Sequence, residues 1–277
     1  MTRHVLVTGA ASGIGLAVAT RFATDGALVT MVDLRAEPLD AASASVASVA
    51  ALGGEAVVTI TADLREPDAP AAVVDRAWDR AVVDVLVNAA GVYPATPFLQ
   101  LDAATWDAVH AVNVRAPLLA TVALARRAET AGTRPCVVNI SSGSALRARP
   151  GAAPYSTSKA ALEMVTRASA LELGAAGIRV NAVAPGFVDV DSDVNRVTDE
   201  YAAAVSANPL GRRGRPTDIA NAVVWLADDT AAEWVTGSIL RVDGGSSTGA
   251  HALPLSWDPV DARADTDDQP IREETSA

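Results

Sequence analysis

The chain has 277 residues, 50% of them hydrophobic and 4% aromatic, and its formal net charge at pH 7 is −11. This acidity argues against a nucleic-acid-binding protein, because phosphate contacts rely on clustered Lys and Arg. No apolar run approaches the roughly 18 residues of a membrane span, and no signal peptide is visible, so we expect a cytoplasmic protein without membrane contact. The single cysteine, Cys136, lies in an apolar run and fits a reducing compartment. The three histidines lack the spacing of metal ligands, so we expect no metal site.

Short β-branched runs alternate with Ala-rich helical stretches along the chain. This alternation predicts βαβ units and an α/β fold, with a doubly wound parallel sheet covered by helices on both faces. We expect one domain over residues 1–245 and a partly disordered, acidic tail over residues 246–277. The predicted strands are residues 4–8, 28–32, 56–61, 82–87, 136–140, 178–184 and 238–242. The predicted helices are residues 13–25, 37–52, 69–80, 103–130 with a break near Asn113, 154–173 and 217–228.

The first motif with chemical meaning is TGAASGIG, from Thr8 to Gly15, between the first strand and the first helix. Its glycines allow a tight turn, a close backbone approach to a diphosphate and close helix–strand packing, with the diphosphate at the helix N-terminus. An ordinary strand-to-helix turn is the alternative. Asp33 ends the second strand 18 residues after Gly15, where a carboxylate accepts hydrogen bonds from the ribose hydroxyls of adenosine and repels a 2′-phosphate. These two features predict an NAD site.

A second motif follows the fifth predicted strand. Ser142 ends that strand, and Tyr155 and Lys159 follow four residues apart in a helix that Pro154 opens. Helical geometry places residues i and i+4 on one face, so the phenol and the ammonium point into one cleft. A nearby ammonium favours the phenolate and lowers the pKa of a phenol. We therefore expect general acid/base catalysis by Tyr155.

Together these motifs resemble the short-chain dehydrogenase/reductase family, and the likeness covers residues 3–245. The resemblance implies a Rossmann-like sheet of seven strands in the order 3-2-1-4-5-6-7. It also implies a bound nicotinamide dinucleotide and reversible hydride transfer between a secondary alcohol and a ketone. The motifs that carry the resemblance are Thr8–Gly15, Asp63-Leu64, Asn88-Ala89-Ala90-Gly91, Asn113, Ser142, Tyr155 with Lys159, and Pro185-Gly186.

The resemblance assigns roles to single residues. Tyr155 is similar to the family's acid/base, Lys159 to its ribose-binding amine, and Ser142 to the serine that orients the substrate oxygen 13 residues before the tyrosine. Asn113 resembles the asparagine that holds a relay water, although a polar residue at a helix kink is the alternative. Asp63 resembles an adenine contact or, alternatively, caps a turn. The full set implied for the cofactor is Gly9, Ser12, Gly13, Ile14, Gly15, Asp33, Asp63, Leu64, Asn88, Ala90, Gly91, Tyr155, Lys159, Pro185, Gly186 and Val188.

One position departs from the family pattern. Val190 stands where the family often has a threonine that bonds the cofactor, so we expect backbone groups of Val188 to hold the carboxamide instead. The resemblance also gives candidate substrate residues, which are Tyr93, Ser144, Arg147 and Phe187. Arg147 and Arg149 are candidates for meeting an anionic substrate, but loop arginines are more often solvated.

The sequence leaves four functions to compare. The preferred one is an NAD-dependent dehydrogenase of a small, cyclic or polyol-like secondary alcohol, assembled as a homotetramer. A 3-oxoacyl-[acyl-carrier-protein] reductase is the alternative. It is disfavoured because Thr133 and Ala176 stand where such reductases present arginines to an acidic carrier. A non-catalytic dinucleotide sensor or a methyltransferase fits poorly, since Tyr155 and Lys159 are both present.

Overall fold

The structure is a computed structural model that describes residues 2–51, 53, 56–190 and 198–249. The chain divides into two units, residues 1–247 and residues 248–277. The first unit holds all helices and strands described below. The predicted boundary at residue 245 and the predicted disorder of the tail stay predictions, because residues 250–277 lie outside the described part.

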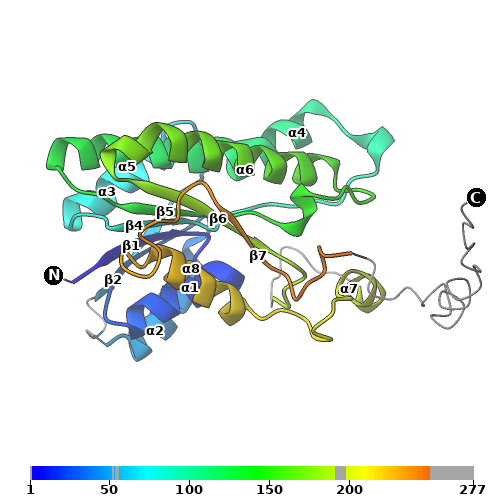
Figure 1. Ribbon diagram of the computed structural model, residues 1–277, viewed down its shortest axis with the longest axis horizontal. Helices are drawn as coiled ribbons and strands as arrows, with labels where there is room; N and C mark the ends of the chain where they lie inside the picture. The colour runs from blue at the N-terminus through cyan, green and yellow to red at the C-terminus, as the bar shows by residue number, and fades with distance from the viewer. Residues whose placement is uncertain (1, 52, 54–55, 191–197, 250–277) are drawn as a thin grey trace, which may run out of the picture. The chain divides into compact units, whose positions relative to one another are not determined.

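A single parallel sheet of seven strands organises the first unit (Figure 1), in the order β3-β2-β1-β4-β5-β6-β7. The predicted sheet and its strand order are confirmed. The fourth strand begins at Val85 rather than at residue 82, because pairing with the first strand starts where Val5 meets Val85. The strands are β1 (His4–Thr8), β2 (Leu28–Asp33), β3 (Val57–Thr61), β4 (Val85–Asn88), β5 (Cys136–Ile140), β6 (Arg179–Pro185) and β7 (Ile239–Val242).

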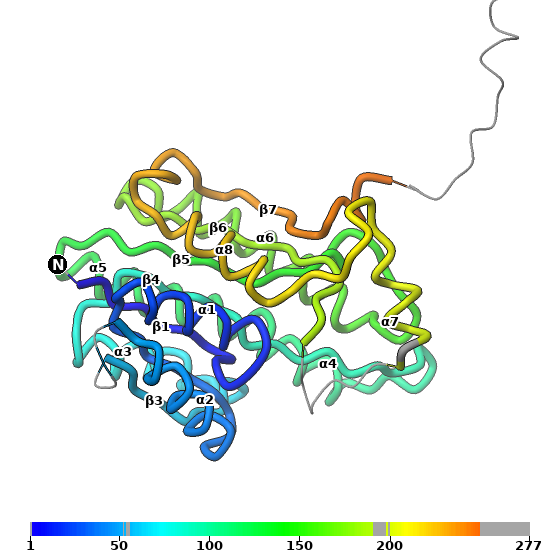
Figure 2. The backbone as a smooth tube through the Cα atoms, turned by 90° about the horizontal axis from the view of Figure 1, so that it is seen from below, coloured from blue at the N-terminus to red at the C-terminus, as the bar shows by residue number. Residues whose placement is uncertain are grey.

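Helices cover both faces of this sheet. One layer contains α1 (Gly13–Thr24), α2 (Ala36–Val49) and α8 (Pro216–Ala227), and Figure 2 shows α1 beside α8. The other contains α3 (Ala69–Arg80), α4 (Ala103–His110), α5 (Ala116–Ala131) and α6 (Ala153–Leu173). Sequence analysis missed α7 (Asp199–Val205) and short helical turns at Phe98–Gln100, Gly143–Ala145 and Gly174–Ala176.

Alternation along the strands builds two separate cores. Val5 and Val7 of β1 face α1, α2 and α8, whereas Leu6 between them packs with the layer of α3 and α5. Since both faces are buried, the strands read as nearly continuous apolar runs rather than as an alternating pattern. Cys136 lies in the first core, and burial raises the pKa of its thiol to about 11.

The stretch Ala103–Ala131 is long and apolar enough, by length and composition alone, to cross a membrane. In the structure it consists of α4, a π-helical segment at Ala111–Arg115 and α5. Its residues Ala120, Leu124 and Ala128 are buried in the second core. The stretch is therefore a core helix of the α/β domain.

Gly15 allows α1 to approach the end of β1, and its replacement tests the local packing. A Cβ at Gly15 would lie 2.1 Å from the carbonyl oxygen of Gly9. We expect Gly15→Ala to destabilise the protein by about 2 kcal/mol or more, because such a clash forces the backbone apart. Thermal unfolding measures the effect. Gly174→Ala is the control, since a Cβ there meets nothing within 4 Å, and an equal melting temperature for the two variants would contradict this packing.

Candidate active site

The predicted functional residues gather where parallel strands end. The loops that follow β1, β4, β5 and β6 all leave the carboxyl edge of the sheet. The strand order reverses between β1 and β4, which makes this point of the edge a topological switch point. Open α/β sheets bind ligands in the crevice at such a point.

The glycine-rich loop is held against the loop after β4. The hydroxyl of Thr8 accepts hydrogen bonds from the backbone N–H groups of Ala89 and Ala90, both at 3.2 Å. Gly9 has a φ of +66°, and a Cβ there would lie 2.7 Å from the backbone of Ala90. Only glycine fits this contact. An open depression beside the loop is lined by Ala11, Ser12, Gly13, Leu16, Ala17 and Pro216.

Asp33 reaches the same loop from the end of β2. Its carboxylate accepts hydrogen bonds from the N–H of Ala11 at 3.0 Å and the N–H of Leu34 at 2.8 Å. The half-buried side chain is thereby fixed beside the glycine-rich turn. Each carboxylate oxygen keeps acceptor capacity for a further donor.

Asp63 forms a local turn with Arg65. The Arg65 guanidinium donates to both carboxylate oxygens, the shortest contact being 2.6 Å, and the Arg65 N–H donates at 2.9 Å. These bonds lower the pKa of Asp63, with the side-chain bond from Arg65 the largest cause. The turn-capping alternative is thus present, and an adenine contact by Asp63 stays a prediction.

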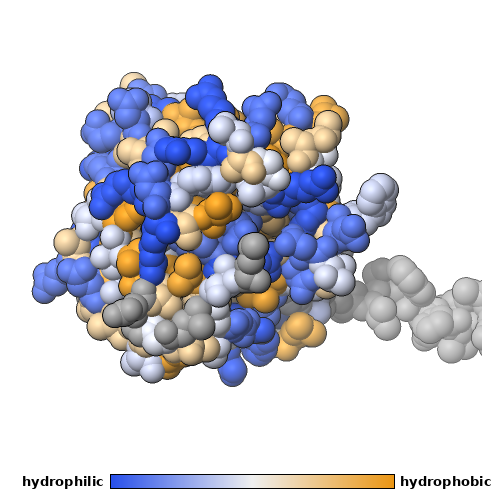
Figure 3. Space-filling model, turned by 90° about the vertical axis from the view of Figure 1, so that its left-hand side faces the viewer, coloured by the Kyte–Doolittle hydropathy of each residue, from blue (hydrophilic) through white to orange (hydrophobic). Residues whose placement is uncertain are grey.

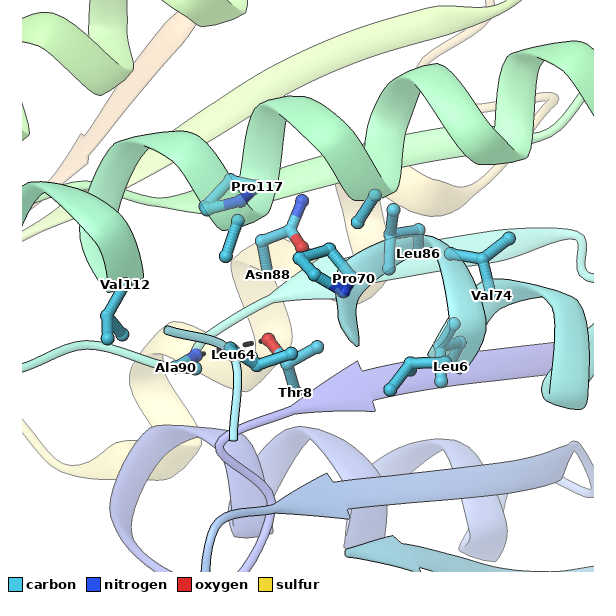
Figure 4. A pocket seen from close by; sticks show the side chains of 13 residues that line it. Leu6, Thr8, Leu64, Pro70, Val74, Leu86, Asn88, Ala90, Val112 and Pro117 are labelled. Carbon is cyan, nitrogen blue, oxygen red and sulfur yellow. Dashed lines mark hydrogen bonds between the residues drawn. The ribbon is translucent and has the colours of Figure 1, made fainter. Parts of the chain in front are cut away.

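Behind the loop after β4 lies a small cavity of about 10 Å³, roughly the space of one water molecule. Figure 4 shows Leu6, Val74 and Leu86 at one end and Ala90, Val112 and Leu64 at the other. The Asn88 side chain turns away from solvent and donates to Asn139 Oδ1 at 2.9 Å. Buried packing of this kind gives the loop a rigid support.

Asn113 is fully buried within the π-helical segment. Its Oδ1 accepts from the N–H of Val92 at 2.9 Å, and its Nδ2 donates to the carbonyl of Val92 at 2.9 Å and to Ser158 Oγ at 3.0 Å. The predicted helix break is confirmed in position, since π-helical turns interrupt α-helices and often occur at functional sites. The side-chain amide thus links two other segments through both of its N–H groups, and the role of Asn113 in holding a relay water stays a prediction.

Ser142, Tyr155 and Lys159 meet at the end of β5. Lys159 is the only lysine of the sequence. It is 4% exposed and donates to the carbonyl of Ile140 at 2.8 Å, which joins α6 to β5. Its Nζ lies 5.8 Å from the centre of the Tyr155 ring. The structure therefore brings the predicted catalytic side chains into one site.

The expected electrostatic effect on the phenol differs from the observed one. Burial raises the pKa of Tyr155, while the Ser142 hydroxyl and the charge of Arg149 lower it to a smaller extent. Burial also lowers the pKa of Lys159 to about 8, so Lys159 loses its proton at a lower pH than an exposed lysine does. The sequence-based expectation that the Lys159 ammonium lowers the pKa of the phenol is wrong in direction, because it ignored the loss of water from both groups.

The loop after β6 offers backbone groups to the site. Val188 forms an isolated parallel bridge with Gly214. In it the carbonyl of Phe187 accepts from the N–H of Gly214 at 3.0 Å, and the N–H of Asp189 donates to the carbonyl of Gly214 at 2.9 Å. Since the bonds of a parallel bridge come from the flanking residues, the N–H and carbonyl of Val188 point the other way. Gly186, after Pro185, is tightly packed, because a Cβ there would lie 2.8 Å from Asp243.

The four predicted substrate residues have different surroundings. Tyr93 lies at the site, with its ring centre 5.5 Å from that of Tyr155. Ser144 is buried and its N–H donates to Ser142 Oγ at 3.1 Å. Arg147 is exposed and bonds the carbonyl of Ser246 at 2.9 Å, and Phe187 lies under the guanidinium of Arg213.

The sequence did not predict two residues near the site as substrate residues. Arg149 donates to Ser144 Oγ and to the Tyr201 hydroxyl, both at 2.6 Å. Arg149 was noticed only as one of two loop arginines. Tyr201 belongs to α7, a helix that sequence analysis missed, and no motif pointed to it.

Comparison with known proteins decides the family. The sequence model of the family described as Enoyl-(Acyl carrier protein) reductase matches residues 9–247. The chain belongs to the short-chain dehydrogenase/reductase family. This short-chain dehydrogenase/reductase carries the family's motifs on the edge of the sheet described above.

Its relatives include enzymes of several substrate types. It is 37% identical to galactitol 2-dehydrogenase (L-tagatose-forming) of Cereibacter sphaeroides, over 86% of this chain and 92% of the relative. It is 38% identical to cis-4-hydroxycyclohexanecarboxylate dehydrogenase of Sinomonas cyclohexanicum, over 88% and 96%. It is 35% identical to 3-oxoacyl-[acyl-carrier-protein] reductase of Synechocystis sp., over 87% and 95%.

Solved structures show the same fold. A structure of 4-hydroxyisoleucine dehydrogenase with NADH superposes with a TM-score of 0.81 at 28% identity, covering 90% of this chain and all of the other. Levodione reductase superposes with a TM-score of 0.82 at 31% identity, covering 90% and 98%. The core of this short-chain dehydrogenase/reductase is thus shared with NADH-complexed relatives.

The lowered pKa of Lys159 is directly measurable, because the chain has no other lysine. We expect the side-chain carbon signal of protein labelled with ¹³C-lysine to titrate at about 8 in the native protein and near 10.5 in urea. Between these pH values the unfolded chain holds more protons than the native chain. The free energy of unfolding therefore rises with pH in this range, by roughly 3 kcal/mol in all. A native titration near 10.5 would contradict the burial of an uncompensated ammonium.

Proposed function

We propose that this short-chain dehydrogenase/reductase interconverts a secondary alcohol and a ketone, with NAD(H) as cofactor and Tyr155 as acid/base. The observation that carries the proposal is the meeting of Ser142, Tyr155 and Lys159 at the end of β5, on the carboxyl edge of the sheet. The Ser142 hydroxyl and the Tyr155 phenol are neighbours, and Lys159 lies one helical turn further on. Substrate oxygen bound between the two hydroxyl groups is then in reach of a proton donor.

The residues present fit a nicotinamide dinucleotide. The glycine-rich loop is closed by contacts that leave no room for side chains, which suits a diphosphate. In this proposal Asp33, fixed beside the glycine-rich turn, binds the ribose, and the backbone groups of Val188 that point away from Gly214 bind the nicotinamide carboxamide. Bound there, the cofactor would take up or deliver the hydride. The implied contacts are those of Gly9, Ser12, Gly13, Ile14, Gly15, Asp33, Asp63, Leu64, Asn88, Ala90, Gly91, Tyr155, Lys159, Pro185, Gly186 and Val188.

The chain's own part in the reaction is movement of one proton. In alcohol oxidation the Tyr155 phenolate accepts the hydroxyl proton while Ser142 holds the substrate oxygen. In ketone reduction the neutral phenol donates the proton to that oxygen. Lys159, through its contact with Ile140, keeps the helix of Tyr155 at the end of β5. Asn113 holds a relay water by its main chain in this proposal, since its side chain is engaged elsewhere.

The proposed substrates are small, cyclic or polyol-like alcohols. The relatives named for galactitol and cis-4-hydroxycyclohexanecarboxylate support this class. A 3-oxoacyl-[acyl-carrier-protein] reductase is the second candidate, favoured by the relative of that name. Two features oppose it: Thr133 and Ala176 replace the expected arginines, and the net charge of −11 repels an acidic carrier.

A panel of alcohols and ketones, followed by absorbance of the reduced nicotinamide with NAD and with NADP, tests this function. Turnover of polyols or cyclic alcohols supports the first candidate, and turnover only of acyl-carrier thioesters supports the second. No turnover of any member by the folded protein would contradict both.

The protein is proposed to act in the cytoplasm as a homotetramer. The outer face of α6 carries exposed Met164 and Leu171, 61% and 84% exposed, and α4 carries half-exposed Trp106. Such apolar groups gain free energy when a second subunit covers them. By contrast, the face in Figure 3 shows apolar residues scattered among hydrophilic ones outside the grey atoms. This supports pairing through the long helices.

Cofactor preference is predicted to depend on Asp33. The wild-type protein should prefer NAD, because a 2′-phosphate beside this carboxylate places like charges together. Asp33→Ala should raise the Kd for NAD about tenfold or more and narrow the gap to NADP, as measured by nucleotide titration. Asp40→Ala on α2 removes the same charge elsewhere and should leave both values unchanged. Equal efficiency with NADP in the unmodified protein would contradict the assignment.

Light scattering tests the assembly. We expect a mass of four chains at micromolar concentration, falling for Met164→Glu because a carboxylate on the α6 face opposes close helix contact. Ser45→Glu on the exposed side of α2 serves as a control that keeps the native mass. A wild-type monomer would overturn the tetramer, and an unchanged Met164→Glu assembly would overturn the proposed face.

A further inference from the structure

Arg149 lies in the loop between β5 and α6, just before the helix that carries Tyr155. Its carbonyl accepts the N–H of Ala152 at 3.1 Å, which anchors the residue near the helix start. One terminal nitrogen donates to Ser144 Oγ and the other to the Tyr201 hydroxyl, both at 2.6 Å. The guanidinium is thus held by two neutral hydroxyl groups from different segments.

No acidic partner balances this guanidinium within the described part of the chain. Two arginines of the loop before α8 do have one: Arg212 pairs with Asp218 at 2.7 Å, and Arg213 with Asp189 at 3.6 Å. Arg149 is half-buried, and its Nε is buried without a hydrogen-bond partner. A partly desolvated cation with an unused donor is costly unless an anion completes it.

The three groups around this point are all available as donors. Ser144 and Tyr201 use oxygen lone pairs to accept from Arg149, so their hydroxyl protons remain free to donate. Neither hydroxyl donates to any acceptor among the described residues. With the terminal N–H groups of Arg149, these two hydroxyls form a cluster of donors that holds no negatively charged acceptor among the described residues. Such a set complements a carboxylate, which accepts through both of its oxygens.

This donor set lies beside the reacting groups. The N–H of Ser144 donates to Ser142 Oγ at 3.1 Å, so the residue that contacts Arg149 also contacts the predicted substrate-orienting hydroxyl. The charge of Arg149 is moreover felt by Tyr155. A small molecule with its alcohol at Ser142 and Tyr155 is therefore within reach of Arg149. By comparison, Arg147 is exposed and its guanidinium bonds the carbonyl of Ser246.

We propose that Arg149, with Ser144 and Tyr201, binds a carboxylate on the substrate and selects secondary alcohols or ketones that are also carboxylic acids. The inference rests on the proposed function and narrows its substrate class. Arg149 is the specificity-determining residue in this account, and Tyr201 of α7 closes the carboxylate site from the other side.

The test compares acids with neutral analogues of the same shape. Substrates are 3- and 4-hydroxycyclohexanecarboxylate and the matching carboxamides, each assayed with NAD. We expect the wild-type kcat/KM to be about 10- to 100-fold higher for one of the acids than for its amide, as charge-assisted hydrogen bonds imply. Arg149→Gln should remove this preference by lowering the value for the acid, with the amide changed less than about threefold.

Two further variants separate charge from geometry. Arg149→Lys keeps the charge but loses the planar fork, so it should retain only part of the preference. Arg126→Gln on the exposed side of α5 removes one positive charge elsewhere and should behave as wild type. Melting temperatures of all variants show whether each is folded.

A binding measurement that needs no turnover completes the test. Calorimetry of the NADH-loaded protein should detect cyclohexanecarboxylate but not cyclohexanecarboxamide, and Arg149→Gln should lose the signal. Equal binding of both ligands, or an equal loss of acid and amide turnover in folded Arg149→Gln, would overturn the carboxylate site. Turnover of neutral alcohols without acid preference would overturn it while leaving the proposed function intact. Carboxylate binding that depends on Arg149, without turnover of any alcohol, would support the carboxylate site and overturn the proposed function.

Discussion

The hydrogen bond from Lys159 to the carbonyl of Ile140 is the contact on which the site depends. It places a 4%-exposed ammonium at the end of β5 and fixes α6 against the sheet. Tyr155, one turn earlier on that helix, is then held beside Ser142, the second residue after the strand. Burial makes the ammonium costly, so its pKa falls to about 8. A buried titratable group with a shifted pKa is typical of a functional site.

A second set of contacts prepares the other half of the edge. Thr8 and Gly9 bring the loop after β1 against Ala89 and Ala90, across the switch point of the sheet. Asp33 then fixes the glycine-rich turn through the N–H of Ala11. These bonds hold the glycine-rich turn and Asp33 in place, and the loop that carries Val188 leaves the same edge of the sheet after β6. In the proposed function this edge holds the dinucleotide.

The sequence predicted the sheet order and the catalytic trio because both have strong local signals. Strands buried on two faces read as apolar runs, and Tyr155 with Lys159 follows helical spacing. The sequence did not predict the features that depend on tertiary contacts. The raised pKa of Tyr155 comes from burial, which spacing cannot report, and the Asp63–Arg65 turn competes with the family role. The Arg149–Tyr201 contact joins residues 52 positions apart, one of them on a helix without a sequence motif.

The central claim is that the phenolic hydroxyl of Tyr155 transfers the proton, whereas cofactor binding is shared by many residues and survives the loss of that hydroxyl. Its most direct test is Tyr155→Phe, assayed for NAD reduction with an alcohol that the wild type oxidises and for NADH binding by fluorescence. The account predicts a loss of turnover of about 10²- to 10⁴-fold, the usual contribution of a general acid/base, with the Kd for NADH changed little. Near-normal turnover in this variant would contradict it.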